Sequence, residues 1–525
     1  MNSKIILAKN INIDKSYKNV LSYSESDMLA LVNNSNNKIA ESNTFSFIKH
    51  DKSLYVDFTY SQCLEATYIA FQNPDYSNKW FFAFVDDIEY KGNKNTEIFF
   101  TVDAWSTWFS NWSPKNAFVI REHVNNDAIG ANLTPEDLAI DGVVCKSEET
   151  ITSFTNYYVC VYSNWNPSLN NASGDGYNDV LQYNKNVYGN AIFFFDLSEA
   201  GIYNLSHFIY IVNKQGHIAD IHDMFIVPKK AIKTTDLNLV SFVYGLSEVT
   251  CAFYELKYDN SMLDNITEES ISITKNTSFT GFTPRNNKVY TYPYNYLYVT
   301  NNVGSNNIYK YEDFSTTNCV FDLQLALSIG MSGRIVPTYY KGQSENTDEA
   351  LTLAKYPTCS WSADSYTNWL TQNSVNIAQT VVGGVASLAT GNVVGTLASG
   401  ANLFGQFFKA QLLPEITGGQ TTGDVNYGNL NNNFKFCKMH AKIEFLRQID
   451  DYFTKYGYKV NRLKTPNITG RRNYNYIEVS SDSEVGFGDV PNKYMEIINN
   501  ICRNGVTIWH DNANVGNYSV NNDII

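Results

Sequence analysis

The amino-acid sequence predicts a β-dominated α+β protein that is built from several domains. Single hydrophobic cores stop growing at about 250–300 residues, and this chain has 525. Aromatic residues make up 14% of it, with 37 Tyr and 31 Phe, a composition that favours strands. Alternating apolar and polar stretches are separated by turns rich in Asn, Gly and Ser. We expect four regions, at residues 1–150, 151–360, 361–428 and 429–525.

The first region, residues 1–150, has the alternation typical of strands. Leu54–Tyr60 alternates in this way, and Trp80–Tyr90 and Glu97–Trp105 flank a turn at Lys91–Asn93, which predicts a hairpin. The apolar residues of Tyr60–Gln72 are partly periodic and predict a short helix.

The second region, residues 151–360, continues this pattern and is predicted to be a middle β-rich part. Its expected strands include Tyr157–Tyr162, Ile192–Phe195, Ser206–Val212 and Thr291–Thr300.

The last region, residues 429–525, is predicted to be α+β. Ala441–Tyr456 has a helical apolar stripe, and Gly457 follows where a helix-ending residue is expected. A second helix begins near Pro491 and runs through Cys502, before a final strand at Val506–Trp509.

The third region, residues 361–428, contains a stretch of 44 residues without a charged side chain, from Ser365 to Phe408. In a chain with 17% charged residues, a run of this length is expected only about 0.02 times by chance. We call Ser365–Phe408 the uncharged segment. Its composition requires a functional explanation.

Small residues recur every four positions in the uncharged segment and would line one face of a helix, where they allow close backbone approach. This small-residue stripe consists of Gly383, Ser387, Gly391, Gly395 and Ser399. The other faces would carry an apolar set that consists of Val381, Val382, Val385, Leu388, Val393, Val394, Leu397, Leu403, Phe404, Phe407 and Phe408.

The uncharged segment is long enough to cross a bilayer, which takes about 20 helical residues. Its interspersed Asn and Gln side chains make it less apolar than a permanent membrane helix. We therefore predict a helical or irregular, glycine-rich segment that inserts into a membrane conditionally. A buried helical hairpin in a soluble core is the alternative.

The net charge of −13 argues against a protein that holds nucleic acid by neutralising its phosphates. The charge is compatible with a protein through which DNA passes without being bound. A basic stretch near the C-terminus could contact DNA or an acidic partner, although a solvated connection or salt bridges between subunits is favoured. Its residues are Lys459, Arg462, Lys464, Arg471 and Arg472.

No catalytic motif or cofactor-binding fingerprint occurs in the sequence, so we predict neither an enzyme nor a cofactor. His217 and His222, near Asp220 and Asp223, lack the spacing of a metal site, and a solvated loop is favoured.

The eight cysteines lie at least 15 residues apart, which predicts isolated buried thiols and folding in a reducing cytosol. Ile5–Ala8 is too short for a signal-peptide core.

Segments near both ends resemble the distal tail-knob proteins of short-tailed bacteriophages that infect Gram-positive bacteria. The matching stretches are FQNPDYSNKWFFAFVDDIEY from Phe71, AWSTWF from Ala104, FVIREHV from Phe118, KYGYKVNRLKTPN from Lys455 and NGVTIWHDNANVGNYSVNND from Asn504.

This resemblance implies a homo-hexameric tube at the tail tip, with tail-tube-like β-barrel domains completed by both ends of the chain. It implies that double-stranded DNA passes without sequence-specific binding and that other tail and collar proteins are partners. The protein would assemble in the host cytoplasm and belong to the virion. Its uncharged segments would plug the lumen and then form a channel in the host cytoplasmic membrane during ejection.

Two other functions are compatible with the sequence. One is a structural tube or adaptor protein whose hydrophobic hairpin is part of its core. The other is a receptor- or cell-wall-binding tip protein that uses its Tyr and Trp side chains to contact glycans.

Overall fold

The structure is a computed structural model of the chain and divides by internal contacts into two compact units. The terminal unit comprises Met1–Asp141, Ser278–Thr291 and Lys442–Ile525, and the central unit comprises Gly142–Thr277 and Tyr292–Ala441. The four regions expected from composition stay a prediction. The residues that the structure describes are 4–48, 52–72, 77–150, 157–163, 181–183, 186–188, 191–196, 198–214, 217, 220–228, 237–244, 247–255, 270–300, 306–325, 332–342, 358–360 and 434–525.

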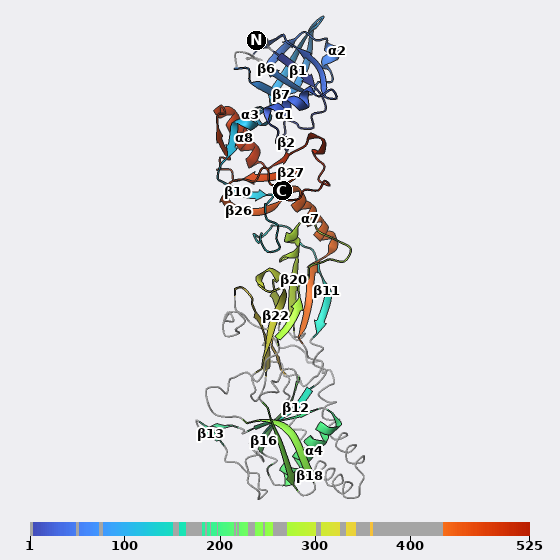
Figure 1. Ribbon diagram of the computed structural model, residues 1–525, viewed down its shortest axis with the longest axis vertical. Coiled ribbons are helices and arrows are strands. Elements are labelled where there is room, and N and C mark those ends of the chain that lie inside the picture. Colours follow the sequence, from blue (N-terminus) through green and yellow to red (C-terminus); the bar gives the residue numbers. More distant parts are fainter. Residues whose placement is uncertain are drawn as a thin grey trace. The chain divides into compact units, whose positions relative to one another are not determined.

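The terminal unit contains strands and short helices from both ends of the sequence (Figure 1). Its strands are β1 (Lys4–Ala8), β2 (Asn19–Leu21), β3 (Lys38–Ser42), β4 (Phe45–Ile48), β5 (Ser53–Val56), β6 (Tyr68–Gln72), β7 (Trp80–Gly92), β8 (Asn95–Val102), β9 (Trp112–Pro114), β10 (Ala117–Glu122), β26 (Tyr458–Lys464), β27 (Tyr474–Val479), β28 (Gly486–Gly488) and β29 (Val506–Trp509). Its α-helices are α1 (Glu25–Asn33), α2 (Tyr60–Cys63), α3 (Ala104–Trp108), α7 (Ile443–Tyr456) and α8 (Asn492–Arg503). Three 3-10 helices lie at Phe109–Asn111, Asn287–Tyr290 and Asn512–Asn514.

The first sheet of the terminal unit is antiparallel and strongly curled. Its order is β3-β1-β6-β7-β8-β5-β4, so β4 is an edge strand and β6 lies in the interior of the sheet. The ring of Phe45 in β4 nevertheless lies 6.1 Å from that of Phe71 in β6, centroid to centroid. This contact requires the edge to bend back over the sheet face, because strands in a flat sheet are about 5 Å apart.

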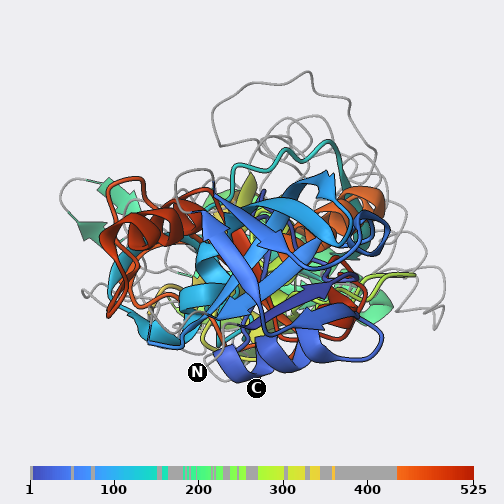
Figure 2. The same ribbon diagram turned by 90° about the horizontal axis from the view of Figure 1, so that it is seen from above.

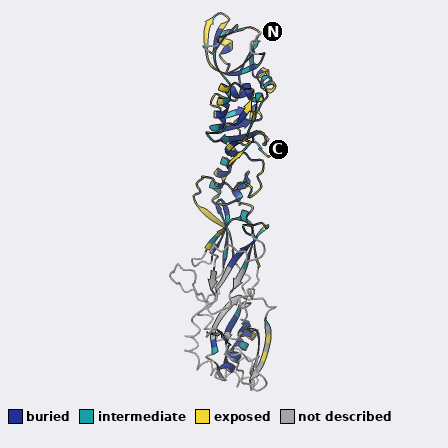
Figure 3. Cartoon of the chain, turned by 90° about the vertical axis from the view of Figure 1, so that its left-hand side faces the viewer, coloured by how far each residue is buried: buried dark blue, intermediate teal, exposed yellow. Residues whose placement is uncertain are grey.

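Both faces of this sheet are covered, because successive side chains of a strand point to opposite sides. Ile5 and Leu7 belong to one apolar core, whereas Ile6 and Ala8 belong to the other. Helix α1 supplies Met28, which is buried with the second core, and α1 lies along the blue N-terminal sheet in Figure 2. Figure 3 shows the resulting concentration of buried residues along these strands. The sheet therefore separates two cores.

The second sheet of the terminal unit joins the two ends of the chain. Its order is β2-β29-β27-β10-β26, and β2 runs parallel to β29, with Asn19 opposite Thr507. The indole N–H of the buried Trp509 donates to Oδ1 of Asn19 at 2.8 Å. The beginning and the end of the sequence therefore fold together.

The predicted C-terminal elements are confirmed, except that helix α7 begins at Ile443, because Ala441 is the last residue of β25. Helix α7 ends at Gly457, whose φ of +64° and N–H bond to the Phe453 carbonyl at 2.8 Å close the helix. Helix α8 and strand β29 lie where the sequence predicts them. These elements carry strong local signals, namely an amphipathic stripe and helix-ending residues.

Three predictions for the N-terminal part need correction. The stretch Leu54–Tyr60 is a strand only as far as Val56, and Tyr60 begins helix α2. The predicted hairpin is confirmed as β7 and β8, although Trp105 lies in helix α3 and not in the second strand. Only Tyr60–Cys63 of the predicted helix Tyr60–Gln72 is helical, and its last five residues form β6. These residues alternate between the two cores, which a strand between β1 and β7 requires.

The central unit consists mainly of antiparallel sheets. Its strands are β11 (Val143–Thr150), β12 (Tyr157–Ser163), β13 (Leu181–Tyr183), β14 (Asn186–Tyr188), β15 (Ala191–Asp196), β16 (Ile221–Pro228), β17 (Asn238–Tyr244), β18 (Ser247–Glu255), β19 (Ser270–Thr274), β20 (Asn295–Thr300), β21 (Asn306–Tyr309), β22 (Asn318–Leu325), β23 (Ser332–Thr338), β24 (Thr358–Ser360) and β25 (Lys435–Ala441). One five-stranded sheet has the order β16-β12-β15-β18-β17, and β13 pairs with β14.

The stretch Ser206–Val212, which the sequence predicts as a strand, is part of helix α4 (Glu199–Lys214). Helix α4 packs on β15 and β18, and the ring of Phe208 lies 4.7 Å from that of Phe193. Leu205, Ile209 and Val212 are also fully buried. This spacing of three and four residues is the helical period, so the apolar run covers the sheet as a helix.

Candidate functional site

The uncharged segment is inserted between two described strands of the central unit. Strand β24 ends at Ser360, and strand β25 begins at Lys435. Every member of the small-residue stripe and of the apolar set lies in residues 361–433, outside the described residues. The described part of the candidate site is therefore the base of this insertion, formed by β24, β25 and their neighbours.

The two strands at the base belong to different four-stranded sheets. Strand β24 is at the edge of the sheet β19-β22-β23-β24 and pairs with β23 from Ser332↔Ser360 to Arg334↔Thr358. Strand β25 is an interior strand of the sheet β11-β25-β20-β21. The chain therefore enters the insertion from an edge strand of one sheet and returns as an interior strand of the other sheet.

The two sheets pack face to face through aromatic rings. Phe321 of β22 and Phe436 of β25 are both fully buried, and their ring centroids are 5.3 Å apart. Tyr309 of β21 lies 5.0 Å from Phe321 in an edge-to-face arrangement. Lys438 crosses the same interface, since its Nζ donates to Oγ1 of Thr274 at 2.6 Å. The base is a β-sandwich with its own apolar core.

Strand β25 is also bound to β11 along most of its length. The ladder runs from Val143↔Ala441 to Thr150↔Lys435. Two ion pairs reinforce it, Lys438 with Glu149 at 2.5 Å and Lys435 with Glu148 at 2.7 Å. The point where the chain returns from the insertion is therefore firmly held.

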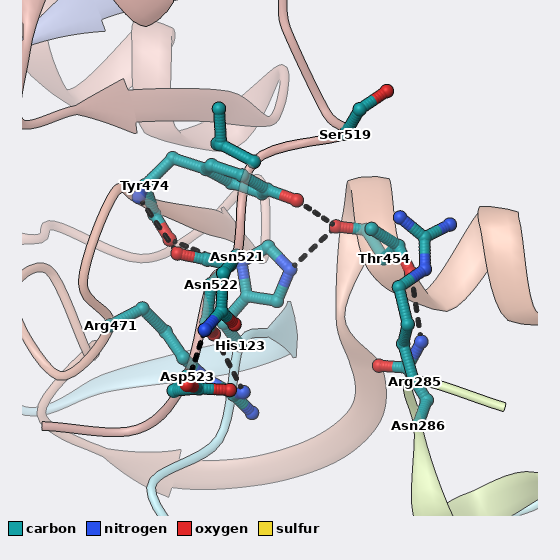
Figure 4. A pocket seen from close by; sticks show the side chains of 11 residues that line it. His123, Arg285, Asn286, Thr454, Arg471, Tyr474, Ser519, Asn521, Asn522 and Asp523 are labelled. Carbon is teal, nitrogen blue, oxygen red and sulfur yellow. Dashed lines mark hydrogen bonds between the residues drawn. The ribbon is translucent and has the colours of Figure 1, made fainter. Parts of the chain in front are cut away.

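A polar pocket of about 330 Å³ lies within the terminal unit (Figure 4). Its wall includes the start of β27, the C-terminal part of α7 and the last residues of the chain. The lining residues are His123, Arg285, Asn286, Thr454, Arg471, Tyr474, Ser519, Val520, Asn521, Asn522 and Asp523.

The histidine of this pocket is a neutral structural residue. Nδ1 of His123 accepts the backbone N–H of Tyr476 at 2.7 Å, so Nε2 carries the proton and donates to the Thr454 carbonyl at 3.1 Å. Burial, reinforced by the nearby Arg471 charge, lowers the pKa of His123 to about 3. With both ring nitrogens engaged, His123 has no free position for acid-base chemistry.

The arginines of the pocket hold the chain's own segments. Arg471 donates to the carbonyl oxygens of Val124 at 2.8 Å and Asn522 at 3.3 Å, and burial lowers its pKa. Arg285 pairs with Asp451 at 2.5 Å. These contacts fasten the C-terminal residues to the rest of the terminal unit.

Two of the other predicted basic residues form ion pairs within the chain. Lys459 contacts Asp137 at 2.7 Å, and Lys464 contacts the buried Glu122. Arg462 is exposed, as is Arg472. Together with Arg471, three of the five basic residues therefore take part in contacts within the chain.

His217 Nδ1 lies 2.7 Å from the Asp220 carboxylate. The predicted loop is wrong for His222 and Asp223, which belong to strand β16, and the structure does not describe the side chain of His222. Within the described ranges, no three His, Cys, Asp or Glu side chains group in a way that could hold a metal ion. No helix in the described part of the chain is long and apolar enough to cross a membrane.

Sequence reasoning missed two groupings that the fold creates. One is a buried cluster of Glu136, Lys288 and Arg121 in the terminal unit. The other is the placement of Cys145 and Cys437 on one face of the paired strands β11 and β25 at the base of the insertion. Neither has a local sequence signal, because its members lie far apart in the chain.

Comparisons with known proteins agree with this architecture. Residues 252–523 match the family model of the C-terminal domain of tail knob protein gp9 from Bacillus phage phi29. Residues 1–113 match the model of the N-terminus of caudoviral major tail proteins.

Comparisons with individual proteins also match the chain to tail knob proteins. The chain is 27% identical to tail knob protein gp9 of Bacillus phage phi29 over 90% of this chain and 89% of that protein. It is 26% identical to the tail knob protein gp9 of Bacillus phage PZA, over 99% and 98% of the two chains. The structure of tail knob protein gp12 of bacteriophage C1 matches in fold, with a TM-score of 0.62, 16% identity and full coverage of both chains.

The family model covers more than half of this chain, and the N-terminal model covers all strands of the curled sheet that the structure places in the terminal unit. The β-dominated fold, with few helices and several sheets, fits this assignment. The chain belongs to the gp9-type tail knob proteins of short-tailed phages, and it is a structural component of the virion tail.

Proposed function

We propose that six copies of the chain form a tube at the tail tip through which the genome passes. Before infection, the six uncharged segments plug the lumen. During ejection they leave it and enter the host cytoplasmic membrane, where they form the channel for DNA. Other tail and collar proteins are the partners at the opposite end of the tube.

The observation that carries this proposal is the position of 44 uncharged residues inside an otherwise polar chain, between β24 and β25. The base of the insertion has its own core around Phe321 and Phe436. We infer that this core keeps the sandwich folded while the uncharged segment changes its surroundings.

Physical chemistry supports storage followed by insertion. One Lys or Asp at the centre of a membrane helix costs about 2.5–3.5 kcal/mol on insertion scales, which accounts for the absence of charge. Helices formed by the segments would satisfy their own backbone groups in lipid. Each buried methylene contributes about 0.8 kcal/mol to membrane binding, and six chains multiply this gain.

The acidic character of the chain suits a conduit through which DNA slides. A net charge of −13 per copy opposes tight phosphate binding. Lys459 and Lys464 are engaged with Asp137 and Glu122, so these cations are already neutralised within the chain. A lumen of this type repels the duplex and leaves it free to move.

The test is deletion of Val375–Phe408 in the phage. We expect particles that assemble and adsorb normally but deliver no DNA into the cytoplasm. Normal infectivity of the deletion phage would contradict the membrane role, and loss of adsorption would point to the receptor-binding alternative.

A matched pair of substitutions sharpens this test. Val385→Lys with Leu397→Lys places charge in the segment and should abolish DNA delivery, whereas Val385→Ile with Leu397→Ile should preserve it. Equal infectivity of the two phages would show that the absence of charge has no role in delivery.

Hexamer formation is tested separately by electron microscopy of the purified protein. Rings with six-fold symmetry and a filled lumen are expected. Another symmetry, or an open lumen in the full-length protein, contradicts the corresponding part of the proposal.

A further inference from the structure

One outer face of the sandwich at the base of the insertion is apolar and aromatic. In the sheet β11-β25-β20-β21, Phe436 points into the sandwich core, and alternate residues of a strand point to opposite sides. Tyr298 is opposite Cys437 on one neighbouring strand and Ile308 on the other. Opposed residues share a face. The residues that point away from the core, which we call the outer apolar face, are Tyr296, Tyr298, Ile308, Cys437 and Met439.

The outer apolar face is accessible to a partner. Ile308 is 42% exposed, and Tyr296, Tyr298 and Met439 are partly exposed. Tyr292 extends the aromatic surface, because its ring lies 5.8 Å from that of Tyr296 in an edge-to-face arrangement and its side chain is 40% exposed. The solvent side of an antiparallel sheet is ordinarily polar, whereas Tyr and Met are enriched where proteins make contacts.

A strand of the other sheet of the sandwich shows this ordinary pattern. In β19, Ile273 is buried in the core, whereas Ser270 and Ser272 point the other way and are exposed. The apolar character of the outer apolar face is therefore not shared by this strand of the same sandwich.

Two lysines at the border of the outer apolar face are already engaged. Lys435 forms an ion pair with Glu148 at 2.7 Å. Nζ of Lys310 lies over the ring of Tyr292, 4.8 Å from its centroid. An occupant therefore needs no counter-charge for these lysines, and an uncharged, apolar occupant fits the surface.

The chain itself supplies such an occupant. Strand β25, which carries Cys437 and Met439, is the strand by which the chain returns from residues 361–433. The uncharged segment ends at Phe408, and residues 409–433 could extend over at most about 80–90 Å. A strand of seven residues, such as β25, is only about 23 Å long, so the uncharged segment is within reach of the whole face.

The chemistry of the uncharged segment matches the outer apolar face. The segment has no charged side chain to desolvate, and its Val, Leu and Phe side chains can pack on apolar surface. Its Asn and Gln amides can accept hydrogen bonds from tyrosine hydroxyl groups. Because the segment belongs to the same chain, its binding is intramolecular and needs no minimum protein concentration, unlike binding of a second copy or of a glycan.

We propose that the outer apolar face is the surface on which the uncharged segment of the same chain is stored before infection. This inference rests on the storage step of the proposed function and names the partner of the segment in that step. Storage removes apolar area from water on both surfaces, and release exposes Tyr296, Tyr298 and Met439 again when the segment enters lipid.

The test is photo-crosslinking of the purified full-length protein. Tyr298→p-benzoylphenylalanine places the crosslinker on the outer apolar face, and Ser272→p-benzoylphenylalanine places it on the exposed side of β19 as the matched control. After illumination, we expect position 298 to be linked to peptides from residues 365–408 in a product that runs as a monomer on a denaturing gel. Position 272 should not be linked to these peptides.

Three outcomes of the crosslinking experiment would overturn the proposal. They are the absence of a crosslink from position 298, a crosslink from position 298 to another part of the chain or to a second copy, and equal crosslinking of the segment from positions 298 and 272.

A pair of charge variants provides the second measurement. Tyr298→Glu places a carboxylate beneath the stored segment, where it lacks a partner, so cleavage by chymotrypsin after Phe404, Phe407 and Phe408 should become faster by about tenfold or more. Ser272→Glu adds the same charge to an exposed position and should leave the cleavage rate unchanged. Circular dichroism establishes that both variants are folded. Equal cleavage rates in the two folded variants would contradict storage on this face.

Dye release from liposomes separates this inference from the proposed function. Crosslinks from position 298 to the uncharged segment without dye release by the unmodified protein would support the storage surface and contradict the membrane role. Dye release without such crosslinks would support the membrane role and overturn the storage surface.

Discussion

Lys288 and Glu136 form a buried ion pair that fastens a distant stretch of sequence to the terminal unit. Nζ of Lys288 lies 2.5 Å from Oε1 of Glu136, and the two side chains are 4% and 1% exposed. Arg121 contacts the other carboxylate oxygen. Residues 278–291 belong to the terminal unit although chain of the central unit precedes and follows them, so this cluster holds an element that local sequence alone would not place.

Removal of the Glu136 charge is expected to destabilise the protein strongly. Glu136→Gln leaves Lys288 and Arg121 without their buried counter-ion, and the loss of one partner from a buried pair costs about 3–5 kcal/mol. The free energy of unfolding measured in denaturant should fall accordingly. Glu484→Gln, which breaks the exposed pair with Lys115 at 2.6 Å, serves as the control and should cause no measurable change. Similar losses in both variants would contradict the structural role of the buried cluster.

Substitution of Gly457 should be far more damaging than substitution of Gly281. Both have positive φ, at +64° and +74°, but a Cβ at Gly457 would lie 2.1 Å from the Glu122 carbonyl oxygen, whereas nothing lies within 4 Å of one at Gly281. Gly281→Ala should lower the free energy of unfolding only by the strain of an alanine in the left-handed conformation, about 1–2 kcal/mol. Gly457→Ala must also displace backbone and should cost more than about 3 kcal/mol. Equal denaturation midpoints would show that β10 and the end of α7 are not in contact.

The free energy of unfolding should fall as the pH is lowered, and His123 should account for part of this loss. Its folded-state pKa is lowered to about 3 by burial, whereas the unfolded value is about 6.5. The contribution of neutral His123 to the free energy of unfolding is complete above pH 6.5. It is lost as the pH falls toward 3, because His123 takes up a proton only in the unfolded chain over this pH range. At pH 5 the loss is about 2 kcal/mol.

His123→Gln removes this proton uptake while keeping a donor and an acceptor. The difference in unfolding free energy between pH 7 and pH 5 should therefore be smaller in the variant than in the parent protein. Parallel pH profiles would mean that His123 is not buried in its neutral form.

The sandwich at the base of the insertion depends on the contact between Phe321 and Phe436. Phe436→Ala creates a cavity between the sheets and should lower the stability of the central unit by about 3–5 kcal/mol. Ile308→Ala, at a position in β21 that is 42% exposed, is the matched control and should change it little. A neutral Phe436→Ala variant would refute the packed core at the base of the insertion.

Local sequence patterns predict the regular elements of this protein well where one signal dominates. Helix α7 combines an amphipathic stripe with Gly457, and β7 with β8 combines alternation with a turn directly after Gly92. The prediction was wrong for Ser206–Val212, where an apolar run rich in Ile and Tyr covers a sheet as part of α4. In this stretch, the burial of residues at helical spacing stabilised a helix although the residues favour strands.

The candidate site was predictable only in part. The uncharged segment is visible in the composition alone, and its membrane role stays a prediction because its residues lie outside those described. The base was not predictable, because β25 finds its partners β11 and β20 more than 100 residues earlier in the chain. The same separation hid the placement of Cys145 and Cys437 on neighbouring strands, since spacing along a sequence does not reveal which strands pair.

The central claim is that the uncharged segment penetrates lipid bilayers, and dye release from liposomes tests it most directly. Purified full-length protein is compared with the Val375–Phe408 deletion and with the variant carrying Val385→Lys and Leu397→Lys, at mildly acidic and at neutral pH. The account predicts release by the full-length protein and none by either variant. Equal release by all three proteins, or no release by the full-length protein at either pH, would contradict it.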